Sequence, residues 1–250
     1  MPLSGPPVNV PALVQGLVDR AQTVAYNTNL PVILFKKLSV TDTLAPDGSV
    51  KHTKEKIYEV TVLHGMTHNR LVSVDGRRLT PAESEAVTDK ERHWRETYAT
   101  NRVDGSSGSE RMDQLINAKL IGRYQFTAIG REILRGRPSI VLEFKPKPGD
   151  LPDERLIDRV LNLFHGRIWI DEEEREIARA EAETAGTMKV WGGLLGSLEH
   201  FELHVDRERS YSGIWFNRHA EILVRARRLL TPIAIRLREI GSDAHVEVAH

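Results

Sequence analysis

The hydrophobic pattern begins with the period of a helix. Apolar residues recur every three or four positions over residues 10–27, and Val10, Leu13, Leu17 and Val18 fall on one stripe of a helical wheel. Polar residues occupy the other side. This segment predicts an amphipathic helix that buries one face.

From Pro31 the period changes to two, which is typical of β-strands. Apolar and polar residues alternate over residues 32–41, and a turn pattern of alanine, proline, aspartate and glycine follows at residues 45–48. A second alternating run covers residues 57–63. The two runs predict a long hairpin, and residues 70–74 predict a shorter third strand.

Three further helices are predicted between strands. Residues 80–83 form a capping box with proline at the first helical position, and a strongly charged helix extends from there to about residue 101. Shorter helices are predicted over residues 110–120 and 152–164. The charged helix has few large apolar residues, so we expect it to lie at the surface.

The rest of the chain predicts strands joined by short connections. These strands are expected over residues 124–135, 139–145, 167–171, 177–184, 199–206, 213–226 and 233–240. Short connections favour antiparallel pairing, and there is no alternation of strands and helices that would indicate a parallel sheet. The predicted fold class is therefore α+β: a large curved antiparallel sheet, an incomplete barrel of nine or ten strands, with helices covering its concave face.

The chain predicts a single domain over residues 10–240. Residues 1–9 are rich in proline and glycine and are expected to be a flexible segment, and residues 241–250 are expected to be a tail. No internal repeat is present.

Composition excludes several classes of protein. Lysine plus arginine and aspartate plus glutamate both number 35, so the formal net charge is zero, whereas nucleic-acid binders usually carry a basic excess. Cysteine is absent, which excludes disulfides, thiolate metal sites and cysteine nucleophiles. No apolar run approaches the ~20 residues of a membrane span. The first residues lack the apolar core of a signal peptide.

Several short sequence segments resemble those of a known family. They are the segments at residues 70–83, Gly136-Arg137-Pro138-Ser139-Ile140-Val141-Leu142 and Gly166-Arg167-Ile168-Trp169-Ile170-Asp171. In this order they resemble uncharacterised bacterial exported proteins related to the outer-membrane lipoprotein-sorting proteins, which have the LolA/LolB-like fold. The resemblance extends from about Pro31 to Ile240. It implies an unclosed barrel with a hydrophobic cavity and a location in the periplasm or cell envelope.

Metal and catalytic candidates are few. His200, Glu202 and His204 alternate on one strand face, and His219 with Glu221 could lie opposite, a set of imidazoles and carboxylates that can bind zinc. A solvated outer face explains the same spacing, and we predict no metal site. The acidic run at residues 171–174 is expected to be a solvated hairpin turn. Because no nucleophile elbow, phosphate loop or dinucleotide fingerprint appears, we predict a non-enzymatic protein without a cofactor.

The candidate ligand-binding segment is apolar and interrupted by glycines. Its members are Met188, Val190, Trp191, Leu194, Leu195 and Leu198. Two interpretations stay open: a gate that meets lipid or a membrane transiently, or a loop folded into the core. Small residues at 178, 180 and 182 similarly indicate either close helix packing or room for a ligand.

The predicted function is that of a periplasmic lipid- or lipoprotein-binding carrier module. Its partner would be a hydrophobic ligand such as an acyl chain or a lipoprotein, and no nucleic acid is expected. The alternative is an envelope protein-interaction or sensor domain on the same fold. The oligomeric state does not follow from the sequence.

Overall fold

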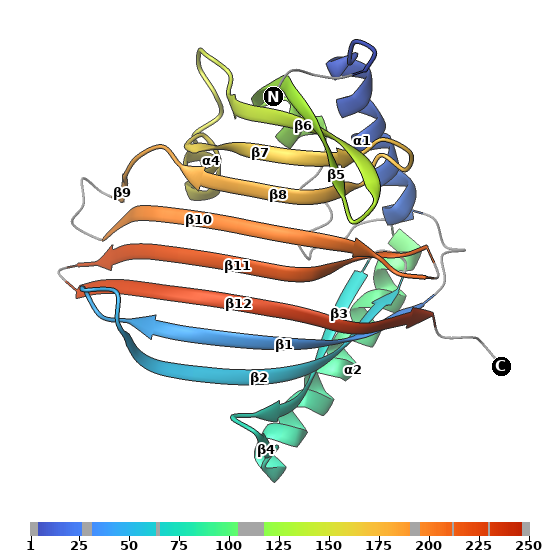
Figure 1. The fold of residues 1–250 in the computed structure, drawn as a ribbon. Helices are drawn as coiled ribbons and strands as arrows, with labels where there is room; N and C mark the ends of the chain where they lie inside the picture. Colours follow the sequence, from blue (N-terminus) through green and yellow to red (C-terminus); the bar gives the residue numbers. More distant parts are fainter. Residues whose placement is uncertain are drawn as a thin grey trace.

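A computed structural model describes residues 5–26, 32–63, 66–104, 118–190, 196–211, 213–229 and 231–246. Its main feature is a single antiparallel sheet of twelve strands (Figure 1). The strands are β1 Ile33–Leu44, β2 Val50–Leu63, β3 Met66–Val74, β4 Arg77–Arg78, β5 Tyr124–Leu134, β6 Arg137–Pro146, β7 Phe164–Asp171, β8 Ile177–Thr184, β9 Met188–Val190, β10 Gly196–Arg209, β11 Trp215–Arg228 and β12 Thr231–Val246. The described helices are α1 Val10–Tyr26, α2 Pro81–Asp104, α3 Ala118–Ile121 and α4 Leu156–Leu161.

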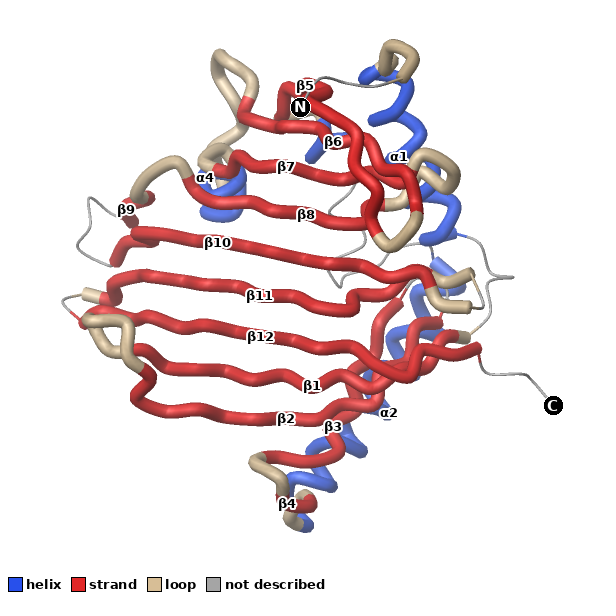
Figure 2. Tube along the Cα trace, in the orientation of Figure 1, coloured by secondary structure: helices blue, strands red, loops and turns tan. Residues whose placement is uncertain are grey.

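The strand order is β4-β3-β2-β1-β12-β11-β10-β8-β7-β6-β5, with β9 paired to β10. β4 and β5 are the two ends of this order and are not paired to each other, so the sheet is open. The predicted fold class, an α+β protein built on a large antiparallel incomplete barrel, is confirmed. In Figure 2 the labelled helices lie near the ends of the strands, and none of them is drawn across the centre of β10, β11 and β12.

The predicted hairpin of residues 32–63 is confirmed as β1 and β2. Asp47 stabilises the turn between them, because its carboxylate accepts hydrogen bonds from the backbone N–H and the hydroxyl of Ser49 at 3.0 and 2.7 Å. Near this turn Thr53 donates to Asp42 across the two strands at 2.6 Å.

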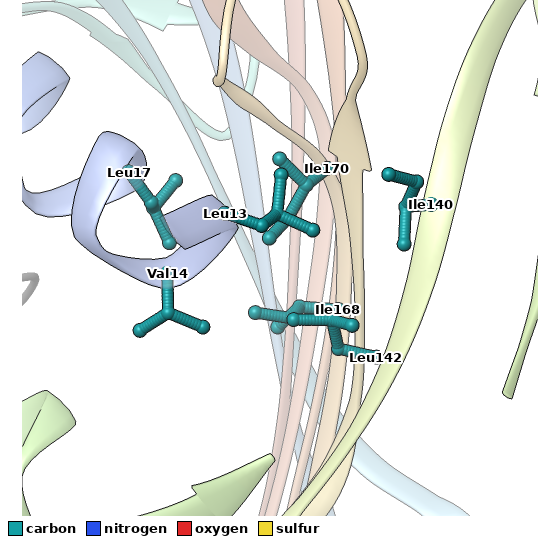
Figure 3. Close-up of a cluster of buried hydrophobic side chains, with 7 residues drawn as sticks. All are labelled: Leu13, Val14, Leu17, Ile140, Leu142, Ile168 and Ile170. Atoms are coloured by element: carbon teal, nitrogen blue, oxygen red, sulfur yellow. The ribbon is translucent and has the colours of Figure 1, made fainter. Parts of the chain in front are cut away.

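The core lies where α1 crosses the upper strands (Figure 3). Asn9 caps this helix by accepting a hydrogen bond from the N–H of Ala12 at 3.1 Å. The apolar stripe of α1 then packs on β6 and β7. The buried cluster consists of Leu13, Val14, Leu17, Ile140, Leu142, Ile168 and Ile170.

The charged helix α2 begins at the predicted capping box. The N–H of Thr80 donates to the Glu83 carboxylate at 2.8 Å, and the N–H of Glu83 donates to the Thr80 hydroxyl at 3.3 Å. The helix packs on β3 through Trp94, whose ring lies 4.7 Å from that of His68. Most of its described side chains are exposed, as the sequence predicted.

Two helix predictions change in the structure. The segment predicted as a helix over residues 152–164 contains only the short α4, because the chain turns at Asn162 and Phe164 already pairs with Thr184 as the first residue of β7. The helix predicted over residues 110–120 falls mostly outside the described residues, which resume with α3. β12 also continues to Val246, beyond the end predicted for the last strand.

No helix in the described part of the chain is both long and apolar enough to cross a membrane.

Candidate functional site

One face of the middle strands is lined with apolar side chains. Residues directly opposite one another in an antiparallel sheet point to the same side, so the register identifies each face. One cross-strand row runs Ala182, Leu203, Ile222, Leu237 from β8 to β12. The next row contains Phe201, Val224 and Ile235. We call this side the apolar face.

The apolar face continues beneath α1. Ile168 of the core cluster pairs with Ala180, which pairs with Val205 and then with Ala220 of β11. Ile168 is 8% exposed, and Ala180 packs against the core. The same side of the sheet is thus sealed by a helix at one end and continues as an apolar surface across the middle strands.

The middle of the apolar face is only half-buried. Leu203, Ile222, Val224 and Leu237 are all partly exposed, in contrast to Leu142 and Ile170 under α1, which are fully buried. The described helices pack at the flanks of the sheet, with α1 at β5 to β7 and α2 at β3. Aromatic rings border the surface on the β7 side, where Phe164 and Phe201 meet edge-to-face at 5.1 Å.

The structure places part of the sequence-predicted ligand segment at one end of this face. β9 and β10 form a hairpin in which Met188 pairs with Leu198, and both side chains are partly exposed. Leu198 also lies opposite Ala226, which is opposite Ile233. Of the remaining candidates, Val190 of β9 pairs with Gly196 of β10, whereas Trp191, Leu194 and Leu195 lie outside the described residues.

The three alanines of β8 face the same side. Ala178 is 3% exposed, and Ala180 packs against the cluster that holds α1. Of the two interpretations, close helix packing therefore explains the small side chain of Ala180. Ala182 lies farther along, beside Leu203, where a larger side chain would rise into the apolar face.

The opposite side of the same strands is polar. His204 pairs with Glu221 and Asp206 pairs with His219, and these side chains point away from the apolar face. His204 Nε2 lies 2.9 Å from an oxygen of Asp206, and the two imidazole rings are 6.2 Å apart. The predicted His200 and Glu202 do not join this cluster, while Asp206, which the sequence reasoning did not include, does. Asp206 follows His204 by two residues, so the same alternation that placed His200, Glu202 and His204 on one face also places Asp206 there.

The surroundings of Asp206 favour the ionised form of its carboxyl. Burial opposes the charge, but hydrogen bonds from Arg179 at 2.8 Å and from His204 outweigh it and lower the pKa of the carboxyl. Its two oxygens have separate partners: Arg179 holds Oδ1, and Oδ2 faces His204.

The acidic turn at residues 171–174 differs from the prediction of a solvated run. Asp171 is fully buried at the end of β7 and accepts two hydrogen bonds from Arg137, at 2.6 and 2.8 Å. The backbone N–H groups of Glu173 and Glu174 donate to the same carboxylate. Asp171 is thus a structural anchor of the turn. The expectation that it is solvated was wrong, because Arg137 of the neighbouring strand β6 lies two residues from its cross-strand partner Ser139 and reaches its carboxylate.

Comparison with known proteins adds the following. No protein-family model matches the chain, and no curated protein matches it. Solved structures do match over nearly its whole length. A domain from Vibrio parahaemolyticus assigned to outer-membrane lipoprotein sorting is 12% identical, with 97% of this chain and 95% of that chain covered and a TM-score of 0.35.

Two other solved structures match over a similar share of the chain. A DUF1329 family protein from Desulfovibrio piger is 14% identical, with 96% and 94% of the two chains covered and a TM-score of 0.36. A LolA superfamily protein from Nitrosomonas europaea is 13% identical, with 95% and 94% covered and a TM-score of 0.32.

A separate pocket of about 410 Å³ opens at the end of the sheet, beside the turns that follow β5 and β10. Arginines line much of it, but Arg137, Arg207 and Arg209 are paired with Asp171, Glu176 and Glu174 respectively. These three guanidinium groups are therefore already paired with carboxylates.

Proposed function

We propose that this protein binds an apolar chain, such as the acyl group of a lipid or lipoprotein, against the apolar face of β8, β10, β11 and β12. The observation that supports this most directly is the contrast along one side of the sheet. Beneath α1 the apolar side chains are fully buried, whereas in the middle strands they are left half-exposed. Contiguous exposed apolar surface of this kind usually marks a binding site.

The energetics favour a ligand of this class. Burial of a methylene group contributes about 0.8 kcal/mol, so about ten methylenes laid on the face give roughly 8 kcal/mol before the cost of ordering the chain. A dissociation constant of about 1 μM is thus the strongest that ten methylenes could give, and the cost of ordering the chain weakens it. No charged group is needed, and the face carries aliphatic side chains and alanines at its centre.

Carriage rather than catalysis is the proposed role. The two rows through Leu203 and Phe201 contain no histidine, carboxylate or serine on β10, β11 or β12, whereas the row beneath α1 continues from Ala220 to Glu239. Met188 and Leu198 of the β9–β10 hairpin lie at one end of the face, where an entering chain would first contact the protein. We further propose that the protein acts in the periplasm or cell envelope, where acyl chains of lipoproteins need transfer.

Neighbouring residues of β11 offer a matched test. Ile222 lies on the apolar face between Leu203 and Leu237, while Leu223 lies on the polar face between Glu202 and Arg236. Both side chains are partly exposed. Ile222→Gln and Leu223→Gln therefore make similar chemical changes on opposite sides of one strand.

Binding would be measured by titrating a fluorescent fatty acid into the wild-type protein and both variants. We expect wild type and Leu223→Gln to bind alike and Ile222→Gln to bind at least about tenfold more weakly, since a buried amide without partners costs 1 kcal/mol or more. Thermal unfolding of each variant checks its fold. Absence of binding by the wild type, or equal loss in both variants, would refute the proposal and favour a protein partner.

A further inference from the structure

The polar face carries a cluster that the carrier function does not use. Three potential metal ligands come from two adjacent strands: His204 and Asp206 from β10, and His219 from β11. One ligand atom from each lies within 4.8 Å of those of the other two. We propose that these residues form a Zn²⁺ site.

The local structure explains why the three side chains converge. His204 and Asp206 are two residues apart on one strand and thus point to the same side. Asp206 is directly opposite His219 across the β10–β11 ladder, immediately before a β-bulge that shifts the register at Arg207. The bulge increases the local twist, and bulges often re-aim side chains beside functional sites.

The ligand types suit zinc. Zinc in proteins is held by imidazole nitrogens at about 2.0–2.1 Å and by carboxylate oxygens at about 2.0–2.2 Å, with three protein ligands and water in open sites. The three side chains are partly exposed, so small χ rotations can bring their atoms from the present spacing to these distances. A bound ion would lie between His204 Nε2 and Asp206 Oδ2, and a proton held between these two atoms would be released to solvent, since zinc binds the deprotonated forms of both ligands.

The surrounding groups are arranged as supports for such a site. Metal-binding histidines usually direct their second ring nitrogen at a carboxylate, which orients the ring. The second nitrogen of His204, Nδ1, lies 3.6 Å from Glu181 Oε1. Arg179 donates to Asp206 Oδ1 and thereby leaves only Oδ2 to face the histidines. On β10, therefore, Asp206 has one oxygen held by Arg179 and one directed at His204, and His204 has its Nδ1 facing a carboxylate.

The position of the site indicates a role in stabilising the sheet and not in binding the apolar ligand. Val205 and Ala220 are the neighbours of Asp206 and His219 on the apolar face, so the metal would lie directly behind that surface. A bound ion would join β10 to β11 across the bulge, where the regular ladder is interrupted. Zinc is thus expected to raise the thermal stability of the protein.

The experiment uses untagged full-length protein and zinc chloride, with stoichiometry measured by equilibrium dialysis and binding by calorimetry. We expect one zinc ion per chain and a higher unfolding temperature with zinc. His204→Gln, His219→Gln and Asp206→Asn should each abolish stoichiometric binding, and Glu181→Gln should weaken it about tenfold. His200→Gln is the matched control, because His200 lies on the same strand beside Glu202 and outside the cluster.

Replacing zinc with Co²⁺ allows the metal site to be observed by visible absorption, which a change in protein stability alone would not alter. The visible absorption of tetrahedral cobalt should appear in the wild type and in His200→Gln and be lost in His204→Gln. Circular dichroism of the metal-free variants checks that each is folded. The proposal is overturned if the wild type takes up no stoichiometric zinc, or if His200→Gln loses binding as His204→Gln does.

Discussion

Removal of the buried carboxylate at the β7–β8 turn should strongly destabilise the protein. Asp171 is fully buried and bonds to Arg137 through both oxygens, while also accepting two backbone N–H groups. Truncating one partner of a buried ion pair costs about 3–5 kcal/mol. Arg137 keeps a partner in Glu173, so we expect Asp171→Ala to fall at the lower end, about 3 kcal/mol.

Glu173→Ala is the matched control. Glu173 pairs with the same arginine at 2.9 Å, but its side chain is 66% exposed. Exposed ion pairs contribute about 0–1 kcal/mol, so this variant should unfold nearly as the wild type does. Urea unfolding followed by tryptophan fluorescence measures both changes. If Asp171→Ala lies within about 1 kcal/mol of wild type, the assignment of Asp171 as an anchor fails.

The pH dependence of this contribution has a definite sign. Burial raises the pKa of Asp171, but the hydrogen bonds from Arg137 and from the backbone of Glu174 outweigh it, so the folded-state pKa lies below the ordinary 3.8. The stabilisation is therefore complete above that ordinary pKa and is lost as the pH falls through the folded value. The difference between wild type and Asp171→Ala should shrink in acid.

Three other predictions follow from the fold. Gly166→Ala should cost roughly 1–3 kcal/mol in urea unfolding, because its Cβ would collide with the carbonyl oxygen of Glu181 on β8; an unchanged midpoint would contradict this. Leu142→Ala should cost about 2–5 kcal/mol, since the side chain is fully buried beneath α1. The exposed Ile133→Ala is its control and should change stability by less than about 0.5 kcal/mol. Glu83 should titrate near pH 2 by carboxyl NMR, because its hydrogen bonds from Arg77 and the Thr80 backbone lower its pKa to about 2; a value near 4.5 would refute the capping geometry.

Local sequence signals predicted those parts of the fold that depend on neighbouring residues. The apolar stripe of residues 10–27, the turn at Asp47 and the capping box at Thr80 are each complete within a few positions, and each appears as predicted. The short α4 shows the limit of such signals. Its apolar residues fit a helix up to Phe164, but pairing of that residue with Thr184 of β8 overrides the local preference.

Features that depend on register could not be read from the chain. The sequence pattern placed His200, Glu202 and His204 on one face, but which residues of β11 lie opposite depends on the bulge after Asp206. The bulge is what makes Asp206 the cross-strand partner of His219. In the same way, the burial of Asp171 depends on Arg137 from the neighbouring β6, which local charge patterning does not reveal.

The strand order has a consequence for how the molecule is made. β1 to β4 form one antiparallel meander and β5 to β8 another, and each can pair as soon as it leaves the ribosome. Among the described strands, β10, β11 and β12 lie between the two halves in the sheet, and β12, which pairs with β1, follows β1 by almost 190 residues in the chain. Until then β1 has an open edge, and pairing between strands so distant in sequence is slow. An unpaired edge can pair with a wrong strand, so this topology leaves β1 open to mispairing until β12 follows.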